Sequence, residues 1–183
     1  MDYYELDMRY EVWDVKAEDL PSAMDRLRQP QNLGANITVP YKETVISLID
    51  EVDEFARIIG AVNTVVNGDG KLKGFNTDSS GFLKALREDA GFEPSEKKVL
   101  ILGAGGAARA VAFSLVQEKV SALVLTDLYL EKATNLAGEL VKFADDKKTK
   151  IRCYHFRNIV DFLICLFNSF TVSFLWYSCI TIL

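Results

Sequence analysis

The sequence has few of the residues that most often build metal and disulfide sites. Its only histidine is His155, and its three cysteines, Cys153, Cys165 and Cys179, all lie late in the chain. The cysteines are odd in number and follow no zinc-ligand spacing, so they predict neither a disulfide framework nor a metal site. We expect His155 to be a polar residue at a strand end rather than a catalytic base. A reducing, cytoplasmic setting fits this composition best.

Basic patches are lacking as well. The formal net charge is -5 over 183 residues, and no stripe of Lys and Arg runs along the sequence. Because proteins bind phosphate backbones through such stripes, we expect no nucleic-acid partner. With 49% hydrophobic residues, the chain can bury one large core or two small ones.

The first part of the chain predicts short, mixed elements, and an apolar repeat from Val45 to Ile59 has helical spacing. Asp19 is expected to cap the first helix, and Thr77 or Asp78 a later one. The expected elements are a strand over 10–15, helices over 20–28 and 45–59, a strand over 35–39, a hairpin with arms 61–66 and 71–76, and a helix after 78.

A regular pattern follows between residues 99 and 130. It consists of an apolar strand over 99–102, a glycine-rich turn, a helix to about 119, a second apolar strand over 122–126 and a helix from about 130. Near-continuous apolar strands separated by a helix indicate a parallel sheet covered on both faces. We therefore predict an α/β fold with a Rossmann-type parallel sheet.

The glycine-rich turn fits the G-x-G-x-x-G/A pattern of dinucleotide sites. Gly103 would permit the tight turn and Gly105 the close approach of a pyrophosphate to the backbone. The alternative is that these glycines only end a strand. The residues predicted to bind a cofactor are Gly103, Ala104, Gly105, Gly106, Ala107 and Asp127.

Asp127 bears on which dinucleotide is bound, because it ends the strand after the turn. A carboxylate there accepts from the ribose 2'-OH of NAD and repels the 2'-phosphate of NADP. NAD is therefore favoured over NADP. The alternative, that Asp127 merely caps the next helix, leaves the choice open.

Lys42 follows Pro40 at the predicted start of a helix, where a positive charge opposes the macrodipole. An unfavourably placed charge suggests a functional reason, such as general base catalysis. Taken alone, Lys42 would be a solvated lysine and Asp78 an N-cap.

Four motifs occur together and in order: Asn36-Ile-Thr-Val-Pro-Tyr-Lys42, Gly60-Ala-Val-Asn-Thr64, Gly74-Phe-Asn-Thr-Asp78 and Leu102-Gly-Ala-Gly-Gly-Ala-Ala-Arg-Ala110. Over about residues 8–150 the series resembles the shikimate dehydrogenase family. The resemblance implies reversible, NAD(P)-dependent hydride transfer between 3-dehydroshikimate and shikimate in aromatic amino acid biosynthesis.

The resemblance also implies residue roles. Lys42 would exchange the proton of the alcohol, and Asp78 would pair with Lys42 and hold substrate hydroxyls. Thr38 and Asn63 would hydrogen-bond the hydroxylated ring. The implied substrate is a small polyol carboxylate, and a homodimer is one assembly that we consider.

The resemblance divides the chain into three parts: an N-terminally truncated α/β substrate-binding and catalytic domain (1–79), a partial NAD(P)-binding Rossmann domain (80–152) and an aberrant hydrophobic tail (153–183). The family's first strand and its carboxylate-binding serine loop have no counterpart in this sequence, so we expect weak or no turnover. The segment Thr126-Asp-Leu128 resembles the NAD-tolerant quinate/shikimate branch. The alternatives are thus a quinate/shikimate dehydrogenase that uses NAD, or a non-catalytic fragment that only binds dinucleotide.

Residues 162–183 carry no charge and are long enough to span a membrane. We favour an accidental tail, such as translation in a wrong frame would produce, over a membrane anchor. Half of a soluble dehydrogenase has no evident reason to cross a bilayer.

Overall fold

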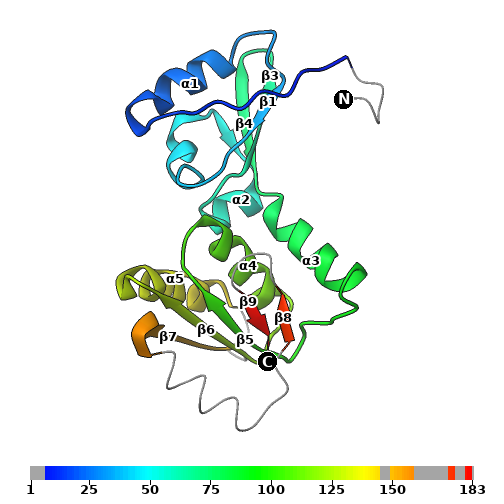
Figure 1. The fold of residues 1–183 in the computed structure, drawn as a ribbon, viewed down its shortest axis with the longest axis vertical. Helices are drawn as coiled ribbons and strands as arrows, with labels where there is room; N and C mark the ends of the chain where they lie inside the picture. The colour runs from blue at the N-terminus through cyan, green and yellow to red at the C-terminus, as the bar shows by residue number, and fades with distance from the viewer. Residues whose placement is uncertain (1–6, 145–148, 159–172, 176–179, 183) are drawn as a thin grey trace.

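The chain folds into two lobes that meet at a narrow junction (Figure 1). This computed structural model describes residues 7–144, 149–158, 173–175 and 180–182. The upper lobe in the figure contains a four-stranded sheet, and the lower lobe contains a five-stranded sheet. The α/β fold class is confirmed, while the domain boundaries at residues 79 and 152 stay predictions.

The upper sheet has the strand order β1-β3-β4-β2. Strands β3 (Thr64–Gly68) and β4 (Lys71–Phe75) form the predicted hairpin. Strand β1 (Gly34–Asn36) pairs antiparallel with β3, and β2 (Glu51–Val52) pairs parallel with β4. The hairpin is therefore the centre of this sheet.

Helix α1 (Leu20–Leu27) confirms the first predicted helix, with Pro21 in its first turn. Its predicted cap is wrong. A 3-10 turn over Ala17–Asp19 leads directly into the helix, so Asp19 already has helical backbone angles and its side chain makes no capping hydrogen bond. The helix contributes to a core made of Leu20, Met24, Leu27, Ile37, Val45, Ala56, Val62, Val65 and Leu72.

The strand predicted over residues 10–15 is wrong. A strand needs a ladder partner, and none of the described strands pairs with this segment. It contacts the rest of the lobe through its side chains instead: Trp13 and Val15 pack against the core, and single hydrogen bonds add to these contacts. The Tyr10 hydroxyl donates to Asn36 Oδ1 at 3.2 Å, and the Tyr41 hydroxyl donates to the Val15 carbonyl at 2.7 Å.

The single helix predicted over 45–59 is also wrong. The segment forms a 3-10 turn (Thr44–Leu48), β2 and the short helix α2 (Glu54–Ile59). Two aspartates interrupt the helical pattern. Asp50 accepts from the Leu72 amide at 2.7 Å, and Asp53 caps α2 by accepting from Phe55 N at 3.1 Å and Ala56 N at 3.4 Å. Aspartate competes with helix in this way because its carboxylate bonds nearby backbone amides.

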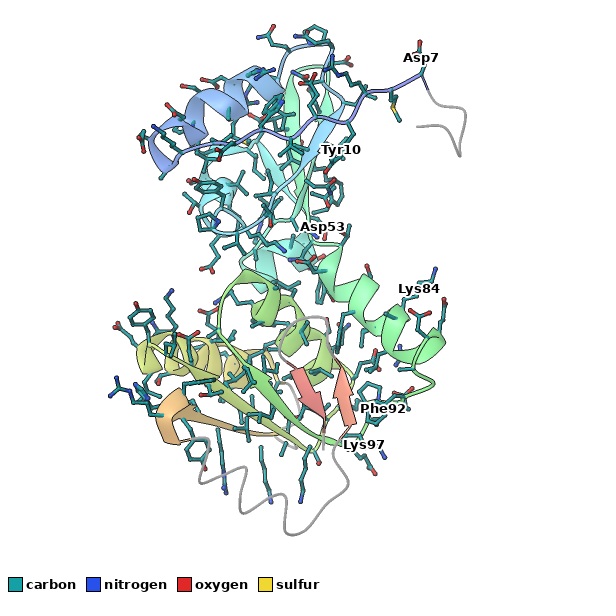
Figure 2. All side chains as sticks on the ribbon, in the orientation of Figure 1. Asp7, Tyr10, Asp53, Lys84, Phe92 and Lys97 are labelled. Carbon is teal, nitrogen blue, oxygen red and sulfur yellow. The ribbon has the colours of Figure 1, made fainter. Side chains whose placement is uncertain are left out.

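Helix α3 (Asp78–Glu88) leads from the junction along the lower lobe. Figure 2 shows Asp53 at the junction, Lys84 pointing away from the body of the molecule, and Phe92 and Lys97 near the base of the lower lobe. The connection between the lobes thus runs from β4 through α3 to the lower sheet.

The lower lobe confirms the predicted strand, helix, strand and helix. These elements are β5 (Lys98–Leu102), α4 (Gly106–Gln117), β6 (Ala122–Asp127) and α5 (Leu130–Phe143). Strand β7 (Lys150–His155), which was not predicted, pairs parallel with β6 and places His155 at a strand end as expected. Fully buried side chains from these elements form the core: Leu100, Ile101, Phe113, Leu115, Leu123, Leu125, Leu136 and Leu140.

The lower sheet has the order β7-β6-β5-β9-β8. Strand β9 (Ile180–Ile182) pairs antiparallel with β5, and β8 (Ser173–Leu175) pairs antiparallel with β9. The remaining residues of the predicted tail (153–183), namely 159–172, 176–179 and 183, lie outside the described residues. Within the part that is described, no helix is both long and apolar enough for a membrane crossing.

Candidate functional site

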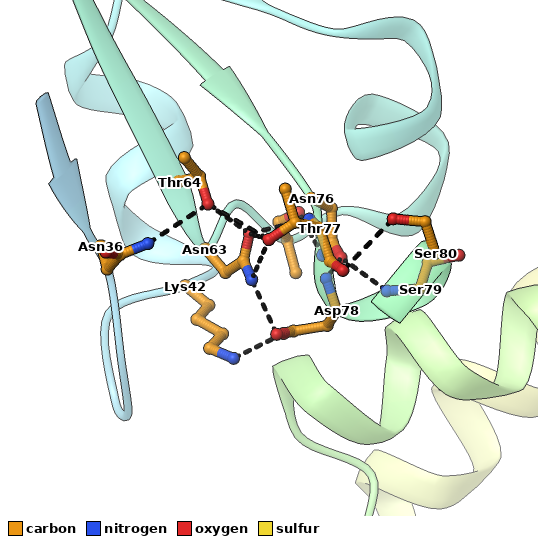
Figure 3. A network of polar contacts seen from close by, with 10 residues as sticks. Asn36, Lys42, Asn63, Thr64, Asn76, Thr77, Asp78, Ser79 and Ser80 are labelled. Carbon is orange, nitrogen blue, oxygen red and sulfur yellow. Dashed lines mark hydrogen bonds and ion pairs between the residues drawn. The ribbon is translucent and has the colours of Figure 1, made fainter. Parts of the chain in front are cut away.

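A charged pair lies where the two lobes meet (Figure 3). Lys42 Nζ donates to Asp78 Oδ2 at 2.6 Å, and the two side chains are 13% and 28% exposed. Their attraction is screened less than that of a surface pair because water reaches them only in part. The structure brings together the two residues predicted as catalytic.

Asn63 fixes the other side of the Asp78 carboxylate. Its amide nitrogen donates to Asp78 Oδ1 at 2.7 Å and to Thr77 Oγ1 at 3.0 Å, and its Oδ1 accepts from Thr77 N at 2.9 Å. Asn63 is only 9% exposed. Both carboxylate oxygens therefore have a defined donor, which holds the carboxylate in one orientation toward Lys42.

Asn76 is a site residue that the sequence predictions did not assign. Its Oδ1 accepts from Asp78 N at 3.1 Å and from Ser79 N at 3.4 Å, and its Nδ2 donates to the Ala61 carbonyl at 2.9 Å. Asn76 therefore satisfies the first amides of α3, and the prediction that Thr77 or Asp78 does so is wrong. Because Asn76 takes that task, the Asp78 side chain is available to Lys42.

The surroundings of Lys42 differ from the prediction. It does not start an α-helix, since only a short 3-10 turn follows it, so the macrodipole argument does not apply. Its carbonyl accepts from Val62 N at 2.7 Å. Its stem packs on the first turn of α4, where a Cβ added to Gly106 would lie 3.0 Å from Lys42 Cβ and 3.3 Å from Cδ. Lys42 therefore contacts the glycine-rich turn directly.

The glycine-rich turn has an open side. Gly103 has φ +111, a conformation that favours glycine, and a Cβ added at Gly103 or Gly105 would meet no atom within 4 Å. Gly105 is the N-cap of α4, and the first amides of a helix have no acceptor within it. Gly106 instead packs on Lys42, and Ala107 is half-buried. Of the predicted cofactor residues in this turn, Gly103 and Gly105 thus face open space, whereas Gly106 packs against Lys42.

Asp127 has backbone partners on both carboxylate oxygens. Oδ2 accepts from Ala104 N at 2.9 Å, and Oδ1 accepts from Tyr129 N at 2.9 Å. The carboxylate thus joins the glycine-rich turn to the turn before α5. Asp127 thus bonds the amide of Tyr129, which precedes α5, and no amide of that helix. The alternative that Asp127 caps the next helix is therefore wrong, and a role toward a ribose stays a prediction.

Thr38 is the predicted site residue that the structure keeps apart. It is exposed, and its side chain makes no hydrogen bond to any described residue. It lies on the segment between β1 and Lys42, so its predicted role depends on a substrate that would reach it.

Comparison with known proteins shows the family of this chain. Residues 1–65 match the family model of the shikimate dehydrogenase substrate binding domain. The shikimate dehydrogenase (NADP(+)) of Moorella thermoacetica is 54% identical over 131 residues, which is 72% of this chain and 44% of that protein. The crystal structure of shikimate dehydrogenase from Aquifex aeolicus is 31% identical with a TM-score of 0.64, over 76% of this chain and 72% of that one. The chain belongs to the shikimate dehydrogenase family.

The family includes structures solved with different ligands. Quinate dehydrogenase from Corynebacterium glutamicum in complex with NAD is 35% identical with a TM-score of 0.69, over 82% of this chain and 53% of that chain. The chain spans about half the length of the curated relatives that it matches. The resemblance seen in the four motifs is confirmed, while the roles of individual residues stay predictions.

Proposed function

We propose that this member of the shikimate dehydrogenase family takes part in reversible oxidation of a ring alcohol, between shikimate and 3-dehydroshikimate. One observation carries the proposal above all. The Lys42 and Asp78 pair, oriented by Asn63, lies against the glycine-rich turn through the contact of Lys42 with Gly106. A proton-exchanging group and a dinucleotide-type turn thus meet at one junction, as oxidation of an alcohol requires.

Lys42 has the donors that the reaction needs. An ammonium group carries three N–H donors, and one of them is directed at Asp78. The other two can reach a substrate hydroxyl. As the uncharged amine, Lys42 accepts the hydroxyl proton during oxidation, and in the reverse direction the ammonium gives that proton to the ketone oxygen. Asp78 compensates the charge that appears on Lys42 and accepts from a neighbouring hydroxyl.

The residues present fit a nicotinamide dinucleotide. Gly103 and Gly105 border open space next to the start of α4, which suits the approach of a pyrophosphate to backbone amides. The Ala104 amide is already bonded to Asp127, so the amides at the start of α4 are the remaining donors. When bound, the dinucleotide accepts or returns the hydride.

We further propose NAD as the preferred cofactor. Asp127 is held at the end of β6 by two amides, which fixes a carboxylate where a 2'-phosphate would be repelled. Relatives that carry the NADP(+) name argue for the opposite preference. Replacement of Asp127 by Asn would decide, because removal of the charge should raise the affinity for NADP relative to NAD.

Two alternatives are kept. The relation to quinate dehydrogenase solved with NAD supports quinate as a substrate. The other alternative is a chain that binds dinucleotide without turnover. The two are separated by measuring oxidation of shikimate and of quinate, each with NAD and with NADP.

The test compares wild type with Lys42→Ala and uses Lys84→Ala as a matched control. Lys84 is an exposed lysine on α3 whose partner, Glu88, lies 3.7 Å away. If the proposal holds, Lys42→Ala lowers kcat by about 10²- to 10⁴-fold, while Lys84→Ala leaves it unchanged. Turnover that survives Lys42→Ala would remove Lys42 from the mechanism. Binding of NAD without turnover in wild type would support the non-catalytic alternative.

A cytoplasmic location, a homodimeric assembly and the absence of nucleic-acid or membrane partners are also proposals. The composition arguments support the location and the lack of a nucleic-acid partner. Sedimentation at several concentrations would test the homodimer.

A further inference from the structure

Arg109 joins the two lobes beside the site. It lies in the first turns of α4 and is the only charged residue of that helix. Its side chain is 11% exposed. Nε donates to the Ile59 carbonyl at 2.7 Å, and the guanidinium pairs with the carboxylate of Glu139 on α5. One side chain therefore contacts α2, which lies at the junction and contributes to the cores of both lobes, and α5, which belongs to the lower lobe.

The end of α2 is shaped to receive Arg109. The Ile59 carbonyl is among the last of the helix, where no intrahelical donor remains. Gly60 follows with φ +70, and a Cβ added there would lie 2.8 Å from a terminal guanidinium nitrogen of Arg109. Glycine at this position thus allows the left-handed helix end and also leaves room for the arginine. Ile59 and Ala61 moreover belong to the core of the lower lobe.

The contact continues into the site along the chain. Two residues after Gly60, Val62 N donates to the Lys42 carbonyl, and the next residue, Asn63, holds Asp78. On α4, three residues before Arg109, Gly106 packs on the stem of Lys42. The same end of α4 therefore contacts the catalytic segment at two points, through Gly106 and through Arg109.

We infer that Arg109 is a positioning residue that fixes Lys42 relative to the glycine-rich turn. It acts through Ile59 and the segment 60–63, and it does not touch the reacting atoms. The kinetic consequence rests on the proposed function, whereas the structural consequence does not. Lysine cannot replace it fully, because an ammonium lacks the planar fork that serves the carbonyl and the carboxylate at once.

The experiment follows amide exchange at Gly60 and Val62, together with the rate at which an amine-acetylating reagent modifies Lys42. The variants are Arg109→Ala, Arg109→Lys and Glu139→Gln. The matched control is Arg87→Ala, since Arg87 is likewise an arginine with two partners, here the carboxylates of Glu93 and Glu118, but lies outside the junction. Lys84 serves as an internal reference for acetylation.

In Arg109→Ala, exchange at both amides and acetylation of Lys42 should each rise by about tenfold, because a charge-assisted hydrogen bond at the junction is lost. In Arg109→Lys and Glu139→Gln, the exchange and acetylation rates should rise less. In Arg87→Ala, both rates should match those of wild type. Where wild type turns over, kcat should fall by about 10- to 100-fold with little change in dinucleotide affinity. If Arg109→Ala does not fold, the other two variants carry the test.

Exchange and acetylation in Arg109→Ala that equal those of Arg87→Ala would overturn the inference, whether or not the protein is active. A rise in exchange without a change in Lys42 acetylation would also overturn it, because Arg109 would then stabilise the junction without positioning Lys42. Lack of turnover in wild type would count against the proposed function alone, since the exchange and acetylation measurements need no activity.

Discussion

The two lobes are stabilised in different ways. The lower lobe is stabilised by an apolar core that comes mainly from β5, α4, β6 and α5, which follow one another in the sequence, and that also includes Ile59, Ala61 and Leu86. The upper lobe has a smaller core, and side chains that bond distant backbone groups complete it. Asn67, for example, donates to the Leu27 carbonyl at 2.9 Å and the Asn32 carbonyl at 2.8 Å, and accepts from Gly70 N at 2.9 Å.

This difference explains where the candidate site lies. The lower lobe contributes a turn whose open glycines expose backbone, and the upper lobe contributes oriented side chains such as Asn63 and Lys42. Neither lobe contains both the glycine-rich turn and the oriented polar side chains. The site therefore depends on the junction as much as on either core.

The largest expected effect is on the lower core. Leu123 is fully buried in β6, so Leu123→Ala should lower the free energy of unfolding by about 2 to 5 kcal/mol through lost burial and a cavity. Urea denaturation monitored by amide exchange in β5 and α4 would measure it. Leu128→Ala, at a position 66% exposed, is the control. Equal effects of the two substitutions would contradict the account of this core.

The same difference explains what could be predicted from the sequence. In the lower lobe, apolar runs such as 99–102 specify strands locally, so the types of β5, α4, β6 and α5 were right and their bounds nearly so. Strand β7 was not predicted. In the upper lobe, the apolar repeat from Val45 to Ile59 fits one helix. The helix is interrupted, however, because the Asp50 carboxylate accepts a hydrogen bond from the Leu72 amide. A bond between residues 22 positions apart leaves no local signal.

The candidate site contains residues that the sequence predicted and residues whose roles it did not predict. The motifs named Lys42, Asn63 and Asp78, which the structure brings together. Asn76 and Arg109 were quoted within the motifs, but the capping of α3 by Asn76 and the contacts of Arg109 were not predicted. The signal for Arg109 was present, because a single charge in an otherwise uncharged helix calls for a partner. The identity of that partner, Ile59 at the end of another helix, could not be derived without the fold.

A smaller effect is expected at Asn67 in the upper lobe. Asn67→Ala removes the donors and the acceptor that join α1 to the hairpin, and leaves partly buried backbone groups without partners. We expect the free energy of unfolding of the upper lobe to fall by about 1 to 3 kcal/mol. Amide exchange should then become faster in β3 and β4, while the amides of β5 and β6 keep their protection. Asn135→Ala, at an exposed position on α5, should have no such effect. A uniform loss across both lobes would show that they do not differ as we argue.

The junction offers a comparison between two adjacent glycines. In Gly106→Ala the new methyl group meets Lys42 Cβ, whereas in Gly105→Ala it meets open space. We expect Gly106→Ala to lower kcat by about tenfold through displacement of Lys42, with dinucleotide affinity kept. Gly105→Ala should instead weaken dinucleotide binding and leave acetylation of Lys42 unchanged. The same response from both variants would mean that the turn does not divide into an open part and a packing part.

The smallest effect concerns acid stability of the upper lobe. The hydrogen bond from Arg28 and then the bond from the Leu72 amide lower the pKa of the Asp50 carboxyl below its ordinary value. A carboxyl with a lowered pKa in the folded state adds stability that is complete above its ordinary pKa, about 3.9, and is lost as the pH falls toward the lowered value. Wild type should therefore lose upper-lobe stability below about pH 4 more steeply than Asp50→Asn. At pH 7, where the carboxylate is charged, the variant should be the less stable protein.

Asp69→Asn, at the exposed hairpin tip, provides the matched change of charge without these partners. Urea titrations of the three proteins between pH 7 and pH 3, with exchange in β4 as the reporter, would compare the slopes. Parallel curves for wild type and Asp50→Asn would mean that the bonds to Arg28 and Leu72 do not stabilise the fold. In that case the break in the predicted helix would need another cause, because Asp50 is the residue that we hold responsible for it.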